Sequence, residues 1–144
     1  MSGAVLDPAI AGIIGKFPEI AAAWLFGSEA RGDAGPTSDI DIALLFEKRG
    51  TTALQAYELL GRLAAQLERV APGRGIDLVL IEQQGPVFQH RVLEEGRLVY
   101  DGDPRRRVDF ESDAMVRFLD FEPSHRLASR YATAGLERWL EAQR

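Results

Sequence analysis

Residues 24–47, WLFGSEARGDAGPTSDIDIALLFE, decide the fold of this chain. The apolar run 21–26 predicts a buried strand, and the Gly27-Ser28 pair after it predicts a turn that leads into one short helical turn. A loop containing glycine and proline follows, and a second strand is then predicted, which opens with Asp39-Ile40-Asp41 and is broken by Gly50. The rest of the chain is arranged around this strand–turn–loop–strand unit.

Two carboxylates open the second of these strands. Asp39 and Asp41 are two residues apart, so in a strand they share one face while the isoleucines that alternate with them point into the core. Two carboxylates about 4 Å apart repel by about 4 kcal/mol at an effective dielectric constant near 20, so a cation usually lies between them. The free backbone N–H groups at Gly27-Ser28 can cradle a phosphate. Together these features predict a metal-dependent enzyme that acts on a nucleoside triphosphate.

A third carboxylate completes the predicted metal site. Mg²⁺ is typically held by one or two carboxylates plus substrate phosphates, and a pair of ions stabilises both the attacking and the leaving oxygen. We expect Asp39 and Asp41 to bridge such a pair. Asp77 lies near the start of the otherwise apolar run 76–81, where an unpaired carboxylate would be costly to bury. We therefore predict that Asp77 orients or deprotonates the attacking hydroxyl.

The remaining predicted contacts are to the phosphates. Gly27 lets the backbone come close to a phosphate, and the Ser28 hydroxyl can donate a hydrogen bond to it. Arg31 is placed either to meet a phosphate or to brace the loop through Asp33 or Asp39.

Composition limits the function classes. The chain has 144 residues and a net charge of −5, with no cysteine. An acidic balance argues against a domain that grips long nucleic acid. The absence of cysteine excludes disulfides and thiolate chemistry. We find no apolar run of about 18 residues and no basic leader, and we expect a soluble cytoplasmic protein.

The order of the elements predicts an α/β or α+β fold, with helices packed on a small mixed sheet. We expect a single domain over 1–144, in which 1–100 form the α/β core and 101–144 a helical segment. A kink or a separation into two helices is expected at Glu122-Pro123, because proline disfavours a continuous straight helix. The elements expected besides the central strands are a helix capped at Asp7-Pro8, a helix from Thr51 or Thr52 to about Val70, a strand 76–81, a helix 86–95, a strand 97–100 and a helix from Asp103-Pro104.

Several charged residues are predicted to lie at the surface. Arg97 follows a helix end and is expected to be solvated. Arg105, Arg106 and Arg107 open the last helix, where they would either be solvated or contact an acidic partner or RNA. An apolar stripe at helical spacing is predicted in the last helix; its members are Leu127, Tyr131, Leu136, Trp139 and Leu140. A set of aromatic residues is expected to lie mostly in the core, with part of the set available for an interface on the spare helical surface; its members are Phe110, Phe118, Phe121, Tyr131 and Trp139.

Gly27-Ser28, ten residues, and then Asp39-Ile40-Asp41 resemble the signature of the polymerase-β-like nucleotidyltransferases. The fuller stretch, GSEARGDAGPTSDIDIALL, is similar to their minimal nucleotidyltransferase (MNT) branch. Within that branch the whole chain resembles the MntA-type antitoxins, which are paired with HEPN ribonuclease toxins (HepT).

The resemblance implies a mixed sheet flanked by helices and a set of site residues. Gly27 and Ser28 would hold the triphosphate, Asp39 and Asp41 would bind Mg²⁺, and Asp77 would take the third-carboxylate position. It also implies transfer of AMP from ATP to a tyrosine of the partner toxin, which silences the ribonuclease. A stable complex with the toxin would then be expected.

Other functions remain open on the sequence. The acceptor of the nucleotide could be a small molecule of the aminoglycoside type, which would need a second subunit to complete the acceptor pocket. The chain could instead be an antitoxin that blocks its partner by binding alone. A polymerase is disfavoured by the acidic balance. Because so short a chain has little left to build an acceptor site, we expect the acceptor to be a macromolecule or a second subunit to complete the cleft.

Overall fold

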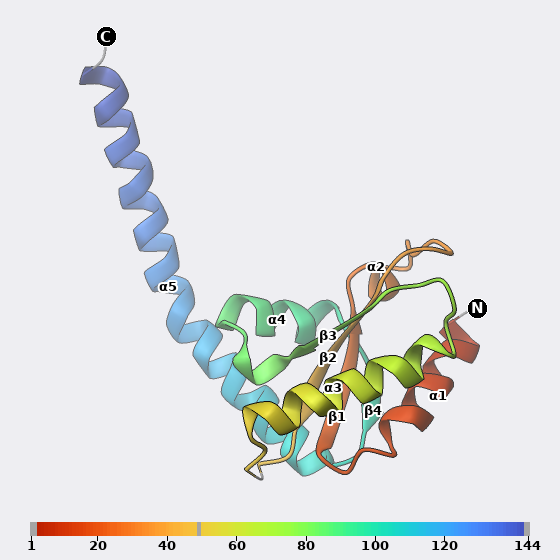
Figure 1. The fold of residues 1–144 in the computed structure, drawn as a ribbon. Helices are drawn as coiled ribbons and strands as arrows, with labels where there is room; N and C mark the ends of the chain where they lie inside the picture. The colour runs from red at the N-terminus through yellow and green to blue at the C-terminus, as the bar shows by residue number, and fades with distance from the viewer. Residues whose placement is uncertain (1–2, 49, 143–144) are drawn as a thin grey trace.

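A computed structural model of the chain describes residues 3–48 and 50–142, and the side chains of all of these except 3–4, 122–134, 136–137 and 140. It is an α/β structure with one sheet and a long C-terminal helix (Figure 1). The elements are α1 (Gly3–Ile14), β1 (Ile20–Phe26), α2 (Ser28–Arg31), β2 (Ile40–Phe46), α3 (Ala53–Glu68), β3 (Ile76–Leu80), a 3₁₀ turn η1 (Ile81–Gln83), α4 (Pro86–Glu95), β4 (Arg97–Asp101) and α5 (Pro104–Ala142).

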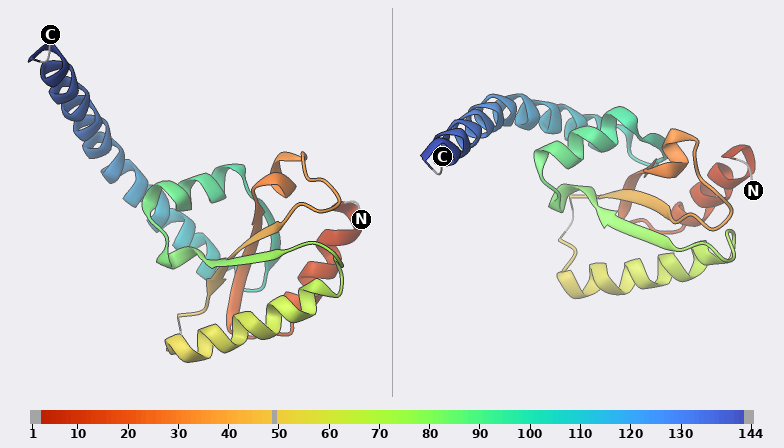
Figure 2. Two further views of the ribbon diagram at one scale, coloured as in Figure 1. Left: turned by 45° about the horizontal axis from the view of Figure 1, so that its top comes forward. Right: turned by 90° about the horizontal axis from the view of Figure 1, so that it is seen from above.

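The sheet has four strands in the order β3-β2-β1-β4. β1 pairs antiparallel with both β2 and β4, and β2 pairs in parallel with β3, so the sheet is mixed. Helices α1 and α3 cover one face, and α4 and the start of α5 lie against the other (Figure 2). The predicted mixed sheet flanked by helices is confirmed.

Alternation along β2 divides the core between the two faces of the sheet. Ile40, Ile42 and Leu44 pack with the residues of α1 and α3. Ala43 and Leu45 pack with those of α4 and α5. Asp39 and Asp41 have the same parity as Ala43 and Leu45, so their side chains belong to the α4 face.

The start of the first helix differs from the prediction. α1 begins at Gly3, and Pro8 lies inside it rather than at its first turn. Asp7 does not cap the helix, because its carboxylate accepts two hydrogen bonds from Arg97, 2.6 Å from Nε and 3.0 Å from Nη2. Arg97 keeps a side chain that is 40% exposed, but the prediction missed its ion pair with a partner 90 residues away along the chain.

The C-terminal helix is continuous. Its start is as predicted, since the Arg106 N–H donates to Asp103 Oδ1 at 3.1 Å. Of the two alternatives predicted at Glu122-Pro123, the separation into two helices was wrong: α5 runs through Pro123 as one helix, which curves along its length (Figure 2). A proline inside a helix removes one backbone hydrogen bond, and bending is the milder response to that loss.

The second half of α5 projects away from the body (Figure 1). In the predicted stripe on this half, Trp139 is exposed, and the other four members lie outside the described side chains. Among the helices of residues 3–48 and 50–142, none is both long enough and apolar enough to cross a membrane.

Two of the three arginines that open α5 are structural. Arg106 is only 8% exposed, and its Nε donates to the Phe46 carbonyl at 3.1 Å while Nη2 pairs with Glu82. Arg107 forms an ion pair with Asp101 at 3.0 Å and is half-buried. Only Arg105 is exposed, as predicted for a solvated residue. The first turn of α5 is therefore bound to the ends of β2 and β4 and to η1.

The turn between α4 and β4 predicts a measurable loss of stability. A Cβ on Gly96 would lie 2.3 Å from the Val92 carbonyl oxygen and 3.0 Å from that of Leu25, and backbone atoms cannot move aside cheaply. We expect Gly96→Ala to lower the free energy of unfolding by about 1–3 kcal/mol, measured by urea denaturation. Gly12→Ala in α1 is the control, because a Cβ there meets nothing within 4 Å. Equal stability of the two variants would contradict the packing described here.

Candidate functional site

The predicted carboxylates come together at one end of the parallel strand pair. Asp41 is the second residue of β2 and lies opposite Asp77, the second residue of β3, in the register of the two strands. Asp39 immediately precedes β2. Asp39 and Asp77 are exposed, whereas Asp41 is half-buried. Because facing residues of paired strands point to the same side, Asp41 and Asp77 form a carboxylate pair at the surface of the sheet.

This arrangement changes the acidity of the central carboxylate. The pKa of Asp41 is raised above its ordinary value, first by burial and then by the negative charges of Asp77 and Asp39. A hydrogen-bonding contact with Asp77 acts in the same direction, and the positive charge of Arg31 opposes the rise. The ionised carboxylate at residue 41 is therefore disfavoured in the folded chain until a positive charge joins it.

Gly27 is placed against this carboxylate by the antiparallel pairing of β1 and β2, in which Phe26 faces Asp41. Its φ of 66° lies in the left-handed region that glycine favours. A Cβ at this position would lie 2.3 Å from Asp41 Oδ2. Any other residue at 27 would displace the Asp41 side chain, so the glycine is required both by the backbone conformation and by the carboxylate.

Ser28 and Arg31 are the first and last residues of α2, the short helix that follows Gly27. The Arg31 N–H donates to the Gly27 carbonyl oxygen at 3.1 Å, which closes this turn. The Arg31 side chain forms a surface ion pair with Asp33, at 3.3 Å between Nε and Oδ2. The loop-bracing alternative for Arg31 through Asp33 is thus present in the structure, while its contact with a phosphate stays a prediction.

Gly75 is a site residue that the sequence reasoning missed. Its carbonyl oxygen accepts a hydrogen bond from the Ile40 N–H at 2.8 Å. A Cβ on Gly75 would lie 2.4 Å from Asp39 Oδ1. The sequence signal for this role was that Gly75, which has no side chain, directly precedes the strand that carries Asp77.

The donor set suits a magnesium ion that also binds substrate. Among residues 3–48 and 50–142, no three histidine, cysteine or acidic side chains form a group that could hold a metal ion by themselves. Mg²⁺ keeps few protein ligands and completes its octahedron with phosphate oxygens and water. The Asp41–Asp77 pair, with its raised pKa at Asp41, fits such an ion. The assignment of all three aspartates as metal ligands stays a prediction.

A second arginine lies near Gly27. A hollow of about 210 Å³ is lined by Gly27, Arg31 and Arg91, together with Phe88 and neighbouring residues of α4. Arg91 is exposed on α4, on the same face of the sheet as Asp41. No sequence pattern distinguished Arg91 from other surface arginines, because only the packing of α4 brings it to β1.

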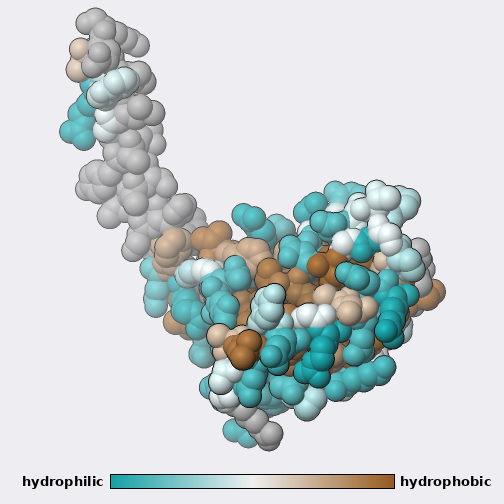
Figure 3. All heavy atoms as spheres, viewed as in Figure 1, coloured by the Kyte–Doolittle hydropathy of each residue, from teal (hydrophilic) through white to brown (hydrophobic). Residues whose placement is uncertain are grey.

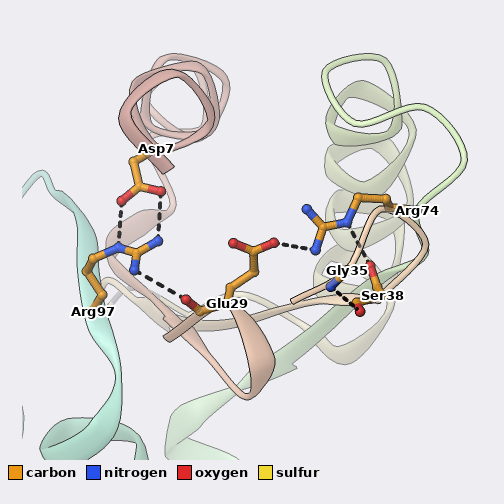
Figure 4. Close-up of polar contacts among 6 residues, drawn as sticks. All are labelled: Asp7, Glu29, Gly35, Ser38, Arg74 and Arg97. Carbon is orange, nitrogen blue, oxygen red and sulfur yellow. Dashed lines mark hydrogen bonds and ion pairs between the residues drawn. The ribbon is translucent and has the colours of Figure 1, made fainter. Parts of the chain in front are cut away.

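A network of ion pairs holds the loop between α2 and β2 (Figure 4). Arg74 pairs with Glu29 of α2, and both side chains are only 10% exposed. The Nε atom of Arg74 donates to the Ser38 carbonyl oxygen at 2.7 Å, and the Ser38 hydroxyl accepts from the Gly35 N–H at 2.8 Å. On the other side, Arg97 Nη1 donates to the Glu29 carbonyl oxygen at 3.3 Å.

This network, which we call the Arg74–Glu29 brace, also lines a hollow of about 670 Å³ that includes none of the three aspartates. It connects the segment before β3 with α2 and with the residue before Asp39. The brace therefore fixes the distance between the Gly27 turn and the carboxylates, although its members do not reach the site themselves.

The sequence and the fold of this chain are both similar to those of known nucleotidyltransferases. Residues 9–105 match the sequence profile of the polymerase beta nucleotidyltransferase domain. No curated protein sequence matches the chain. Several solved structures have a similar fold at low sequence identity.

The first is a toxin–antitoxin crystallised with AMP-PNP (TM-score 0.68, 20% identity, 88% of this chain and 98% of the other covered). The second is a tri-AMPylated HEPN toxin of Shewanella oneidensis in complex with an MNT antitoxin (TM-score 0.64, 18% identity, 90% and 98% covered). The third is described as a minimal nucleotidyltransferase (TM-score 0.52, 30% identity, 67% and 94% covered). Because residues 9–105 match this domain profile and the fold agrees with it, the chain belongs to the polymerase-β-type nucleotidyltransferase family.

Proposed function

We propose that this chain is a Mg²⁺-dependent adenylyltransferase antitoxin, which transfers AMP from ATP to a tyrosine of a HEPN-type toxin and so neutralises it. The observation that carries the proposal is the Asp41–Asp77 pair packed against Gly27. Two of the similar structures support the choice of substrate and acceptor, since one contains AMP-PNP and another a tri-AMPylated HEPN toxin.

The proposed reaction is a substitution at the α-phosphorus of ATP. The acceptor oxygen forms a bond to this phosphorus, the bond to the oxygen that bridges to the β-phosphorus breaks, and pyrophosphate leaves. Asp77 is exposed and adjacent to Asp41, so it is the group that takes the proton of the acceptor hydroxyl. The pKa of Asp41 is raised, so its ionised form is disfavoured, and a bound cation would favour that form.

The bound cation would lie at Asp41 and Asp77, with Asp39 beside them. Mg²⁺ would supply the positive charge that offsets the negative charge on the carboxylates and on the triphosphate. Gly27 brings backbone close to the phosphates, the Ser28 hydroxyl donates to them, and Arg31 and Arg91 add positive charge at the small hollow beside Gly27.

A protein acceptor agrees with the surface of the chain. On the described part of α5, Val116 and Leu119 are exposed apolar residues, and the helix extends beyond the body (Figure 1). Exposed apolar side chains on a projecting helix are typical of a surface that a partner covers. We therefore propose a complex between this chain and its toxin in addition to the transfer reaction.

The proposal is tested by the mass of a co-expressed HEPN-type partner. We expect AMP units to be added by the wild-type chain and to disappear with Asp39→Asn/Asp41→Asn, because the cation site is lost. The expected loss of rate is at least about 100-fold, typical of removing a principal charge-stabilising group. Glu68→Gln removes an exposed carboxylate from the end of α3, away from the proposed partner surface on α5, and is the control.

The same experiment separates the alternatives. An unmodified partner that is still neutralised by Asp39→Asn/Asp41→Asn would contradict catalysis and support an antitoxin that acts by binding. A partner that is neither modified nor neutralised by wild type would remove the proposal as a whole.

The raised pKa of Asp41 predicts that Asp41→Asn stabilises the metal-free protein. An acid whose pKa is higher in the folded state loses folding stability once the pH exceeds its unfolded value, so the penalty is present at pH 7. We expect the midpoint of thermal unfolding to rise by about 3 °C at pH 7 and the gain to vanish as the pH falls to the ordinary value of 3.8. Asp109→Asn should leave the midpoint unchanged. A lower midpoint for Asp41→Asn at pH 7 would show that the site carries no excess negative charge.

The Arg74–Glu29 brace predicts a split between stability and nucleotide affinity. Arg74→Met leaves Glu29 buried without a partner, and we expect it to cost about 3 kcal/mol of unfolding free energy and to weaken ATP binding. The double variant Glu29→Met/Arg74→Met should recover most of the stability, because no unpaired charge remains. It should not recover the affinity measured by calorimetry, because the hydrogen bond to Ser38 is still missing. Recovery of both would mean that Arg74 is not a positioning residue.

A further inference from the structure

β3 carries Asp77 and is one of the two edge strands of the sheet, of which the other is β4. It pairs with β2 on one side, and within residues 3–48 and 50–142 no strand pairs with its other side. Figure 2 shows β3 running alongside α3 at the margin of the molecule. An unpaired edge presents backbone donors and acceptors that another chain can use.

The register decides which backbone groups are available. The Ile40 N–H donates to Gly75 O, so Gly75 directs its polar groups toward β2. In a parallel ladder every second residue directs its backbone N–H and C=O groups to the same neighbouring strand. The backbone groups of Asp77 and Val79 in β3 therefore also point toward β2. The N–H and C=O groups of Ile76 and Leu78, on either side of Asp77, therefore point away from the sheet.

A shallow apolar groove lies next to this edge. Its volume is about 870 Å³, and it runs between α3 and β3. Figure 3 shows apolar side chains at the surface in the band between α3 and the strands behind it. Tyr57 on its rim is 77% exposed. The residues that give the groove its apolar lining are Tyr57, Leu60, Gly61, Ala64, Ile76 and Leu78. Three charged residues also line it, Glu58, Arg62 and Asp77.

Asp77 borders the groove, but its side chain alternates with those that form the apolar lining. Ile76 and Leu78 pack with the core on the α3 face, whereas Asp77 alternates with them and points to the α4 face, beside Asp41. A strand added at this edge would alternate in the same way. Its residue opposite Asp77 would stand on the α4 face, and the residues before and after would enter the groove.

We propose that the edge of β3 is the acceptor site, and that it binds an extended polypeptide segment as an additional strand, with a hydroxyl residue opposite Asp77 and apolar residues on both sides of it. This inference rests on the proposed transfer to a protein. Main-chain hydrogen bonds to Ile76 and Leu78 give affinity, and the groove selects the apolar neighbours. Strands in a sheet are about 4.8 Å apart, which brings the acceptor side chain next to the Asp41–Asp77 pair.

The test fills the groove without disturbing the site. A Cβ on Gly61 meets nothing within 4 Å, so Gly61→Trp adds bulk to the groove from the exposed side of α3. We expect it to raise KM for a HEPN-type partner at least tenfold and to leave ATP affinity and the slow hydrolysis of ATP by water unchanged. Tyr57→Glu, which places a charge on the rim, should act in the same direction. Gly61→Ala and Gly12→Trp, which adds the same bulk to an open position on α1, should behave as wild type.

The outcomes separate this inference from the proposed function. If wild type modifies no protein, the proposed function fails and the acceptor site fails with it. If wild type modifies the partner and both Gly61→Trp and Tyr57→Glu do so equally well, only the acceptor site at β3 is overturned. Peptide sequencing of the modified partner gives an independent check: apolar residues on both sides of the modified hydroxyl residue support the site, and charged residues on both sides overturn it.

Discussion

The close approach between the Gly27 backbone and the Asp41 carboxylate is the constraint on which the rest of the structure depends. A Cβ at residue 27 would lie 2.3 Å from Asp41 Oδ2, so this carboxylate lies directly against the turn after β1. The antiparallel pairing of β1 and β2 produces that contact, and the parallel pairing of β2 with β3 then brings Asp77 to the same place. One sheet with two kinds of pairing thus gathers segments that are far apart in the sequence. The burial of Asp41 there, together with the negative charges of Asp77 and Asp39, raises its pKa.

Such a site needs a rigid surrounding loop, because repulsion between carboxylates would otherwise move them apart. The segment 32–39 has no regular secondary structure. Its rigidity comes from the Arg74–Glu29 brace and from Arg97, whose contacts to Glu29 and Asp7 join α1, α2 and β4. Arg74 and Arg97 are thus engaged by the loop and by Asp7, and the positive charge of the fold that acts on Asp41 is that of Arg31. Because the pKa of Asp41 is raised in spite of Arg31, a cation supplied with the substrate would offset the remaining negative charge.

The sequence predicted the elements well because their signals are local. Apolar alternation located β2 and β3, and the Gly85-Pro86 start and Gly96 end located α4 at Pro86–Glu95. The errors arose where a distant partner decides the outcome. Asp7 looked like a helix cap but binds Arg97, and Arg106 looked solvated but is buried against Glu82 and the Phe46 carbonyl. In the site, the signature located Gly27 and the aspartates, whereas Gly75, Arg74 and Arg91 matter through packing that no short pattern encodes.

The two sides of β3 explain how so small a chain can combine two binding tasks. On its inner side β3 aligns Asp77 with Asp41 through the parallel register. On its outer side no strand of the described residues 3–48 and 50–142 pairs with it, and an apolar groove lies alongside. A single strand at the edge of a sheet can therefore present a carboxylate to a nucleotide held by the neighbouring strands, and a row of hydrogen-bonding groups to an incoming segment. A separate acceptor-binding domain is unnecessary if the acceptor completes the sheet, because the distance between strands then sets the distance between the two reacting groups.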